Sequence, residues 1–221
     1  MTLADQPIFQ FLAQYAYEPM WVYAAVIGMM LASGFGLPLP EEVTLISVGV
    51  LAFMGSRPDL FPPPTPDASP VNMHHAAIVA FIAVILSDTL IYMIGRMWGR
   101  KILFHPRMRR LVSEESLFKV EAWTHRYGMV AVFVFRFTPG VRFPGHLACG
   151  IMKLPLWKFI SVDAFAAGIS VPTQIYLIAI YGEPILKFLQ EVKLFVLALA
   201  AIGLVVFLAR KYYLKTVQSK A

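Results

Sequence analysis

Residues 129–150 read MVAVFVFRFTPGVRFPGHLACG, an apolar run that carries two arginines and is interrupted by proline and glycine. Its first residues are typical of a membrane helix, but Pro139 has no backbone donor and Gly140 is permissive, so the helix cannot continue. Pro144 and Gly145 repeat this pair of residue types, and we expect a further break in the helix there. In lipid, freed backbone groups and guanidinium charge are both costly unless they line a cavity or face a polar partner. The stretch therefore predicts a place where charge is handled inside a membrane.

The composition indicates an integral membrane protein. Of the 221 residues, 58% are hydrophobic and 14% are charged, and the mean hydropathy is +0.67. A soluble domain carries about 25% charged residues. The apolar stretches 76–93, 159–181 and 194–209 are each close to the roughly 20 residues that cross a bilayer as a helix. We therefore expect an all-α polytopic membrane protein.

The basic residues predict the orientation in the membrane. The net charge is +6, but the basic residues cluster beside apolar segments, as in the positive-inside pattern, rather than forming a nucleic-acid face. We expect the basic loop 96–126 and the C-terminus to be cytoplasmic, in a multi-pass protein of the inner membrane that binds no nucleic acid. The single Cys149 precludes an intramolecular disulfide and a cysteine-based metal site, and no metal or cofactor is predicted.

A comparable interruption lies nearer the N-terminus, where residues 34–42 read GFGLPLPEE. Pro38 and Pro40 end the preceding apolar stretch, and Glu41 and Glu42 follow directly. The next apolar helix has about twelve residues and rises only about 18 Å, less than the roughly 30 Å of a hydrocarbon core. We interpret the two halves as a re-entrant hairpin. The alternative is one spanning helix followed by a short buried helix.

The two interruptions predict an architecture. A hairpin and a spanning helix repeat in opposite orientation, and an extra span follows, giving two opposed re-entrant hairpins and three to four transmembrane helices in an inverted-repeat layout. Paired interrupted segments of this kind point to a midplane site in transporters. We expect an interfacial segment at 1–19, a membrane domain at 20–182, and a final helix with a basic tail at 183–221. A homo-oligomer is compatible with this layout.

The ionisable residues at these positions are the candidate functional groups. They are Glu41, Glu42, Asp88, Arg136 and Arg142. An acid near the centre of a membrane helix costs roughly 2.5–3.5 kcal/mol, so such residues are functional candidates by default. Arginine suits phosphate because its planar fork donates two hydrogen bonds and stays charged. The alternative is a structural ion pair that holds the hairpins together.

Two further polar residues carry weaker expectations. Asp163 lies one turn inside the apolar stretch 159–181, close to Lys158, and we expect it to cap the helix or to pair with that lysine. His146 directly follows the break expected at Pro144 and Gly145, and there we favour a hydrogen-bonded packing role over a pH-sensitive ligand.

Several segments resemble the DedA family, also described as SNARE-associated Golgi or VTT-domain membrane proteins. They are residues 38–42 (PLPEE), Ser87-Asp88 with Tyr92 and Gly95-Arg96, residues 136–142 (RFTPGVR), Cys149-Gly150, and residues 180–182 (IYG). The similarity covers roughly residues 20–182. Glu41 stands where the family usually has a small residue, and Ser87 replaces the usual glycine.

The resemblance implies two opposed re-entrant hairpins and translocation of a phospholipid or a polyprenyl phosphate such as undecaprenyl phosphate, often with dependence on a proton gradient. It assigns essential roles to Glu42, Asp88, Arg136 and Arg142. We expect the arginines to bind phosphate and the acids to couple protons, with an anionic lipid or polyprenyl phosphate as partner. The alternatives are a membrane scaffold for envelope integrity, a proton or ion exchanger, and an enzyme acting on lipid phosphates, for which no catalytic motif is seen.

Overall fold

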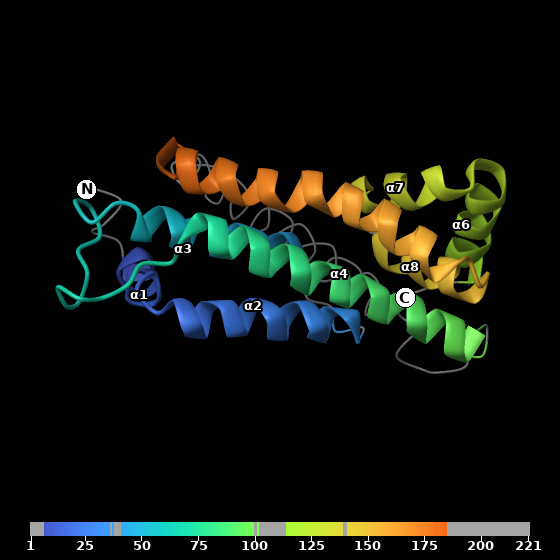
Figure 1. Cartoon of the computed structure of the whole chain (residues 1–221), viewed down its shortest axis with the longest axis horizontal. Coiled ribbons are helices and arrows are strands. Elements are labelled where there is room, and N and C mark those ends of the chain that lie inside the picture. The colour runs from blue at the N-terminus through green and yellow to red at the C-terminus, as the bar shows by residue number, and fades with distance from the viewer. Residues whose placement is uncertain are drawn as a thin grey trace, which may run out of the picture. The chain divides into compact units, whose positions relative to one another are not determined.

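A computed structural model describes residues 7–35, 37, 41–99, 101, 114–138 and 141–184. Within these residues every regular element is a helix (Figure 1). The chain divides into two compact units, Met1–Ile180 and Tyr181–Ala221, and the description below concerns the first. The labelled helices are α1 (Pro7–Tyr15), α2 (Pro19–Gly34), α3 (Glu41–Gly55), α4 (Met73–Trp98), α6 (Glu114–Tyr127), α7 (Met129–Phe137) and α8 (Arg142–Ile151). An unlabelled helix, Leu156–Pro184, follows α8.

Two helices of the described residues are long and apolar enough to cross a bilayer, namely α4 and Leu156–Pro184. Helix α4 begins where the Asn72 side chain accepts hydrogen bonds from the amides of His74 and His75. Its 26 residues rise about 39 Å, more than a hydrocarbon core. The third predicted span, at 194–209, and the tail after it lie outside the described residues.

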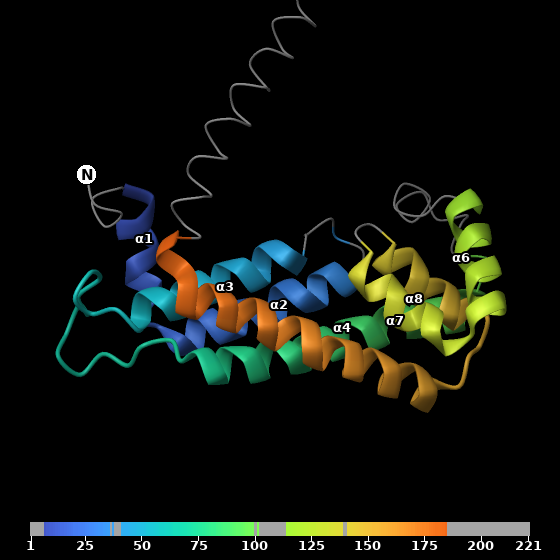
Figure 2. The same cartoon turned by 90° about the horizontal axis from the view of Figure 1, so that it is seen from above.

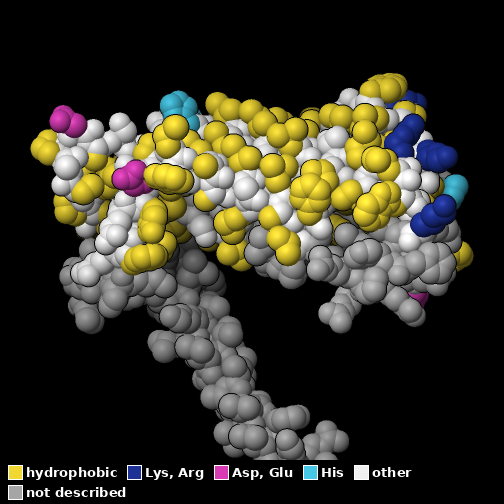
Figure 3. All heavy atoms as spheres, turned by 90° about the horizontal axis from the view of Figure 1, so that it is seen from below, with side chains coloured by type: hydrophobic (Ala, Val, Ile, Leu, Met, Phe, Trp, Pro, Cys, Tyr) yellow, Lys and Arg dark blue, Asp and Glu magenta, His cyan; other side chains and the backbone are white. Residues whose placement is uncertain are grey.

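Large apolar side chains remain exposed along both long helices. On α4 the exposed residues Ile78, Ile82 and Leu86 follow a four-residue spacing, and Phe165 and Ile169 do so on the later helix. Figure 3 shows hydrophobic side chains over the middle of one face and basic side chains gathered at one end. A helix face of this kind suits lipid rather than water. The surface therefore agrees with the membrane assignment made from composition.

Helices α2 and α3 flank the first predicted interruption. Helix α2 ends at Gly34 and α3 begins at Glu41, so the chain leaves the helical conformation where the prolines predicted it would. Pro38 and Pro40 themselves lie outside the described residues. The two helices have 16 and 15 residues and rise only about 24 and 22 Å. These lengths are compatible with a re-entrant hairpin but do not establish one.

Helices α7 and α8 flank the second interruption. They have 9 and 10 residues, and Thr138 and Val141 separate them on either side of Pro139 and Gly140, which lie outside the described residues. The further break predicted at Pro144 and Gly145 is wrong, because both residues lie inside α8 and are buried. Proline is tolerated in the first helical turn, where its missing N–H has no intrahelical acceptor.

Helix α8 packs closely against α4. A side chain added at Gly150 would meet the Tyr92 carbonyl, and one added at Gly95 would meet the Leu147 carbonyl. The contact also holds the turn after α8, where the Tyr92 hydroxyl donates to the Leu154 carbonyl. Figure 2 shows α6, α7 and α8 gathered near one end of α4. This packing fixes the start of α8 beside the middle of α4.

Candidate functional site

The second interruption brings two arginines to one carboxylate in the middle of α4. Arg136 lies in the last turn of α7, and its Nη1 donates to Asp88 Oδ2 at 2.7 Å. Arg142 is the first residue of α8, and its Nη2 donates to Asp88 Oδ1 at 2.6 Å. The Asp88 side chain is fully buried. Each oxygen of this carboxylate therefore accepts a charge-assisted hydrogen bond, which compensates its removal from water.

Arg136 also joins two other helices to the site. Its Nη1 donates to Asp163 Oδ1 at 2.9 Å, and its Nε donates to Ser170 Oγ at 3.1 Å. Its Nη2 lies 3.5 Å from Glu41 Oε1, at the first residue of α3. Only 3% of the Arg136 side chain is exposed. One buried guanidinium thus links α3, α4 and the helix Leu156–Pro184 to the end of α7.

Arg142 is the more accessible arginine. It also pairs with Glu41, and 18% of its side chain is exposed. Its Nε has no hydrogen-bond partner among the described residues. A polar cavity of about 170 Å³ borders both arginines. Its other described lining residues include Glu41, Glu42, Ser170 and Gln174.

His146 lies one turn after Arg142 on the same face of α8 and is fully buried. Its Nδ1 is 3.2 Å from Asp88 Oδ1, and its Nε2 is 3.7 Å from Asp163 Oδ1. Its ring meets Phe159 edge-on, with the centroids 5.2 Å apart. Among the described residues neither ring nitrogen makes a hydrogen bond. His146 is therefore packed as expected, but the hydrogen bond expected with that packing is not found among the described residues, and the ring lies next to two carboxylates.

Asp88, His146 and Asp163 offer three metal-ligand atoms within 4.8 Å of one another. However, both carboxylates already accept hydrogen bonds from the Arg136 guanidinium. A divalent cation there would face that positive charge at close range, which disfavours binding. The donor set thus fits a guanidinium better than a metal ion, and we assign no metal to it.

The structure brings together most of the residues predicted from sequence. Glu41, Asp88, Arg136 and Arg142 form one cluster. Glu42 is exposed and lines the polar cavity beside them. The resemblance assigned an essential role to Glu42, whereas in the structure it is Glu41 that pairs with both arginines.

Asp163 is the member of the cluster that sequence reasoning missed. The expected cap or pair with Lys158 is wrong, because the Lys158 ammonium lies over the Trp157 ring, 5.4 Å from its centroid. Asp163 turns inward to Arg136 instead. Asp163 and Ser170 are seven residues apart and therefore share a helix face. That polar spacing within an apolar helix was the available signal.

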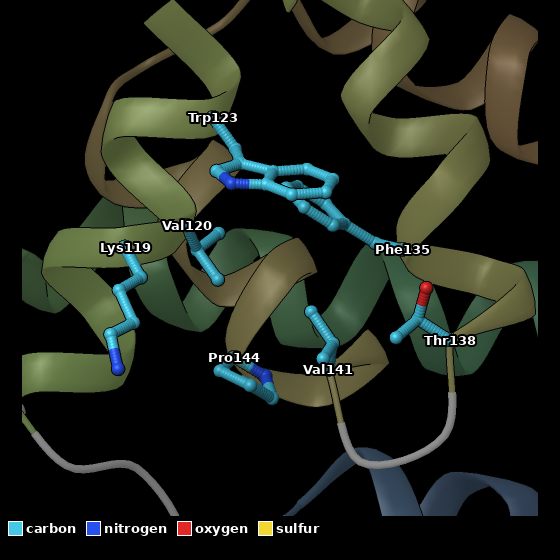
Figure 4. A pocket seen from close by; sticks show the side chains of 7 residues that line it. All are labelled: Lys119, Val120, Trp123, Phe135, Thr138, Val141 and Pro144. Carbon is cyan, nitrogen blue, oxygen red and sulfur yellow. The ribbon is translucent and has the colours of Figure 1, made fainter.

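An apolar pocket of about 280 Å³ borders the same interruption. Figure 4 shows side chains from α6 and from the α7–α8 region turned toward one space. The α7–α8 region contributes Phe135, Thr138, Val141 and Pro144, and α6 contributes Lys119, Val120 and Trp123. The residues around the break therefore border both a polar cavity and an apolar one.

Comparison with known proteins identifies relatives of this chain. The model of the VTT domain matches residues 39–181, which include every member of the cluster. A Haemophilus influenzae protein described as an uncharacterized membrane protein is 38% identical over 70% of this chain and 68% of its own length. Undecaprenyl phosphate transporter A of Bacillus subtilis is 27% identical over 65% of this chain and 64% of its own length. Protein DedA of Escherichia coli is 24% identical over 74% of this chain and 68% of its own length. No solved structure matches the chain.

Proposed function

The chain is a VTT-domain membrane protein of the DedA family, and from that premise we propose that it is a transporter that moves a phosphate-bearing lipid between the leaflets of the inner membrane. The lipid is undecaprenyl phosphate or a phospholipid. The observation that carries the proposal is the buried cluster in which Arg136 and Arg142 meet acids beside a polar cavity. The name of the B. subtilis relative supports a polyprenyl phosphate as substrate.

The chemistry of the two arginines supports a phosphate ligand. A phosphate offers several strong acceptor oxygens, and guanidinium forks match them with paired hydrogen bonds. Arg142 is partly exposed and has one N–H without a partner among the described residues. An entering headgroup would take this donor first and then compete with Glu41 and Asp88 for the others. The acids thus hold the arginines in position until an anion replaces them.

The apolar pocket supports a lipid rather than a free anion. It touches the break at Thr138 and Val141, directly beside the chain segment that carries both arginines. We propose that a lipid whose headgroup binds the arginines places its chain against the apolar walls of this pocket. The pocket thus keeps that chain in surroundings as apolar as the bilayer core that it leaves. A soluble phosphate gains nothing from this pocket.

The exposed basic residues support an orientation. Such residues lie at the end of α4, on α6, in the turn after α8 and in the first turn of the helix Leu156–Pro184; among them are Arg96, Lys119, Arg126, Lys153 and Lys158. By the positive-inside pattern this end is cytoplasmic. The short helices on either side of each interruption then enter from opposite sides as re-entrant hairpins. We propose that the acids Asp88, Glu41 and Glu42 take part in proton coupling.

A structural role is the second candidate, because the same ion pairs would also hold a scaffold together. Every acid of the cluster has an arginine partner, and such ion pairs can hold helices together without a ligand. In that case substitutions would reduce stability and envelope integrity together, and purified protein would move no lipid. The names of the relatives above are those of membrane proteins and a transporter rather than of an enzyme.

Reconstitution into liposomes tests the proposal. Wild-type protein should speed the movement of undecaprenyl phosphate between leaflets, and Arg136→Ala with Arg142→Ala should abolish that acceleration. Arg142→Lys keeps the charge but loses the fork, so a folded protein with reduced transport is expected. Arg126→Ala is the matched control, since Arg126 is exposed on α6 and lies over the Tyr127 ring. Full transport by the double variant would overturn the assignment, and release of inorganic phosphate would indicate an enzyme instead.

A further inference from the structure

The charges inside the cluster do not balance. Glu41, Asp88 and Asp163 supply three carboxylates, and Arg136 and Arg142 supply two guanidinium groups. These side chains are 0–18% exposed, so an uncompensated charge among them is costly. One additional proton would make the group neutral.

The position of His146 indicates where that proton lies. Its two ring nitrogens face Asp88 and Asp163, and ionised carboxylates only accept hydrogen bonds. A neutral imidazole has one donor and one acceptor nitrogen, so it would present a lone pair to one of the two carboxylates. An imidazolium has donors on both sides and suits both neighbours.

Among the described residues, the cations nearest to the ring are two arginines that already pair with acids. Arg136 faces the ring's neighbours from α7 and Arg142 from α8, and both are engaged with Asp88. Glu41 reaches the cluster from α3 through the arginines. The Phe159 ring covers His146 from the helix Leu156–Pro184. The histidine is thus enclosed by acids, arginines already paired with acids, and an apolar ring.

We propose that His146 holds one exchangeable proton between Asp88 and Asp163, and that this proton binds together with the anionic headgroup at Arg136 and Arg142. The second clause rests on the proposed function, whereas the first does not. A headgroup that draws the guanidinium groups toward itself leaves Asp88 and Asp163 less compensated. The carboxylates then need the proton on His146 more strongly. By linkage the proton must strengthen headgroup binding by the same factor.

The first arm of the test uses the protein without lipid. Histidine ¹⁵N NMR of the full chain in detergent, compared with His146→Gln, identifies the His146 signals by difference. Near neutral pH we expect an imidazolium, with protons on both nitrogens, and its loss as the pH rises. A neutral ring at every pH at which the protein stays folded would overturn the proposal. His125→Gln, at an exposed position on α6, is the control for assignment.

The second arm measures binding of farnesyl phosphate by calorimetry in two buffers with different enthalpies of ionisation. At a pH at which the NMR arm finds His146 neutral without lipid, wild-type protein should bind up to about one more proton per lipid than His146→Gln, and over this pH range its affinity should fall by up to about tenfold per pH unit. The titration of the lipid phosphate is common to both proteins and cancels in their difference. Equal proton uptake by the two proteins would overturn the linkage.

A double variant separates a proton site from a merely structural histidine. In His146→Gln with Asp163→Asn the cluster is neutral without any added proton. We expect farnesyl phosphate to bind this variant more tightly than His146→Gln alone, with no dependence on a protein proton. If the double variant binds less tightly than the single one, the charge-balance argument is wrong. If wild-type protein binds no farnesyl phosphate, this substrate of the proposed function fails, while the NMR arm still decides the proton site.

Discussion

Replacement of Asp88 by asparagine should destabilise the protein more than any other isosteric change in the cluster. Asp88 accepts from Arg136 at 2.7 Å and from Arg142 at 2.6 Å, and its side chain is fully buried. The amide keeps the volume but removes the charge and turns one acceptor into a donor that faces a guanidinium. Removing one partner of a buried ion pair costs about 3–5 kcal/mol. Because Asp88 serves both arginines, we expect the upper part of that range.

The assay is equilibrium unfolding in mixed micelles with increasing SDS, followed by tryptophan fluorescence. A loss of 3 kcal/mol would change the unfolding equilibrium constant by roughly a hundredfold. Glu115→Gln is the matched control, because it breaks an ion pair with Lys119 whose two side chains are 78% and 71% exposed. Exposed pairs of this kind contribute little. If Asp88→Asn and Glu115→Gln lower the free energy of unfolding equally, the buried ion pairs of the cluster do not stabilise the fold as we infer.

Three further changes have defined outcomes. Gly150→Ala should lower the free energy of unfolding in the same SDS titration by about 1–3 kcal/mol or more, because the added methyl group would meet the Tyr92 carbonyl of α4. Its control is Gly28→Ala, which should be neutral or stabilising because an added methyl group there has nothing within 4 Å. Arg136→Lys should keep the charge but lose hydrogen bonds that one ammonium cannot all replace, so we expect lower stability by the same titration and slower transport in liposomes. Tyr92→Phe should cost about 0.5–1.5 kcal/mol in that titration, since the Leu154 carbonyl loses this donor but keeps the Arg96 guanidinium at 3.3 Å.

The positions of the helices could be predicted from sequence because proline and glycine act locally. The end of α7 at Phe137 follows from the missing donor of Pro139 and the conformation it imposes on Thr138. The same reasoning was wrong for Pro144, since the effect of a proline depends on its place in the helix. Once α8 begins at Arg142, Pro144 falls in the first turn and is harmless.

The partners within the site could be predicted only in part. Intramembrane charge singled out Asp88, Arg136 and Arg142, because an unpaired charge there is too costly to be incidental. The choice between Glu41 and Glu42 depends on helix register, since adjacent residues do not share a face. Asp163 was assigned to its sequence neighbour although its partner, Arg136, lies 27 positions away along the chain. Such a pairing follows from the packing of helices, which local spacing does not specify.

The most direct test of the central claim is a leaflet-translocation measurement in liposomes that compares undecaprenyl phosphate with undecaprenol, each with and without a proton gradient. The two lipids share a tail and differ only in the group that Arg136 and Arg142 would bind. We predict that the protein accelerates movement of the phosphate and not of the alcohol, and that a proton gradient drives its accumulation in one leaflet. Equal acceleration of both lipids, or of neither, would contradict the account.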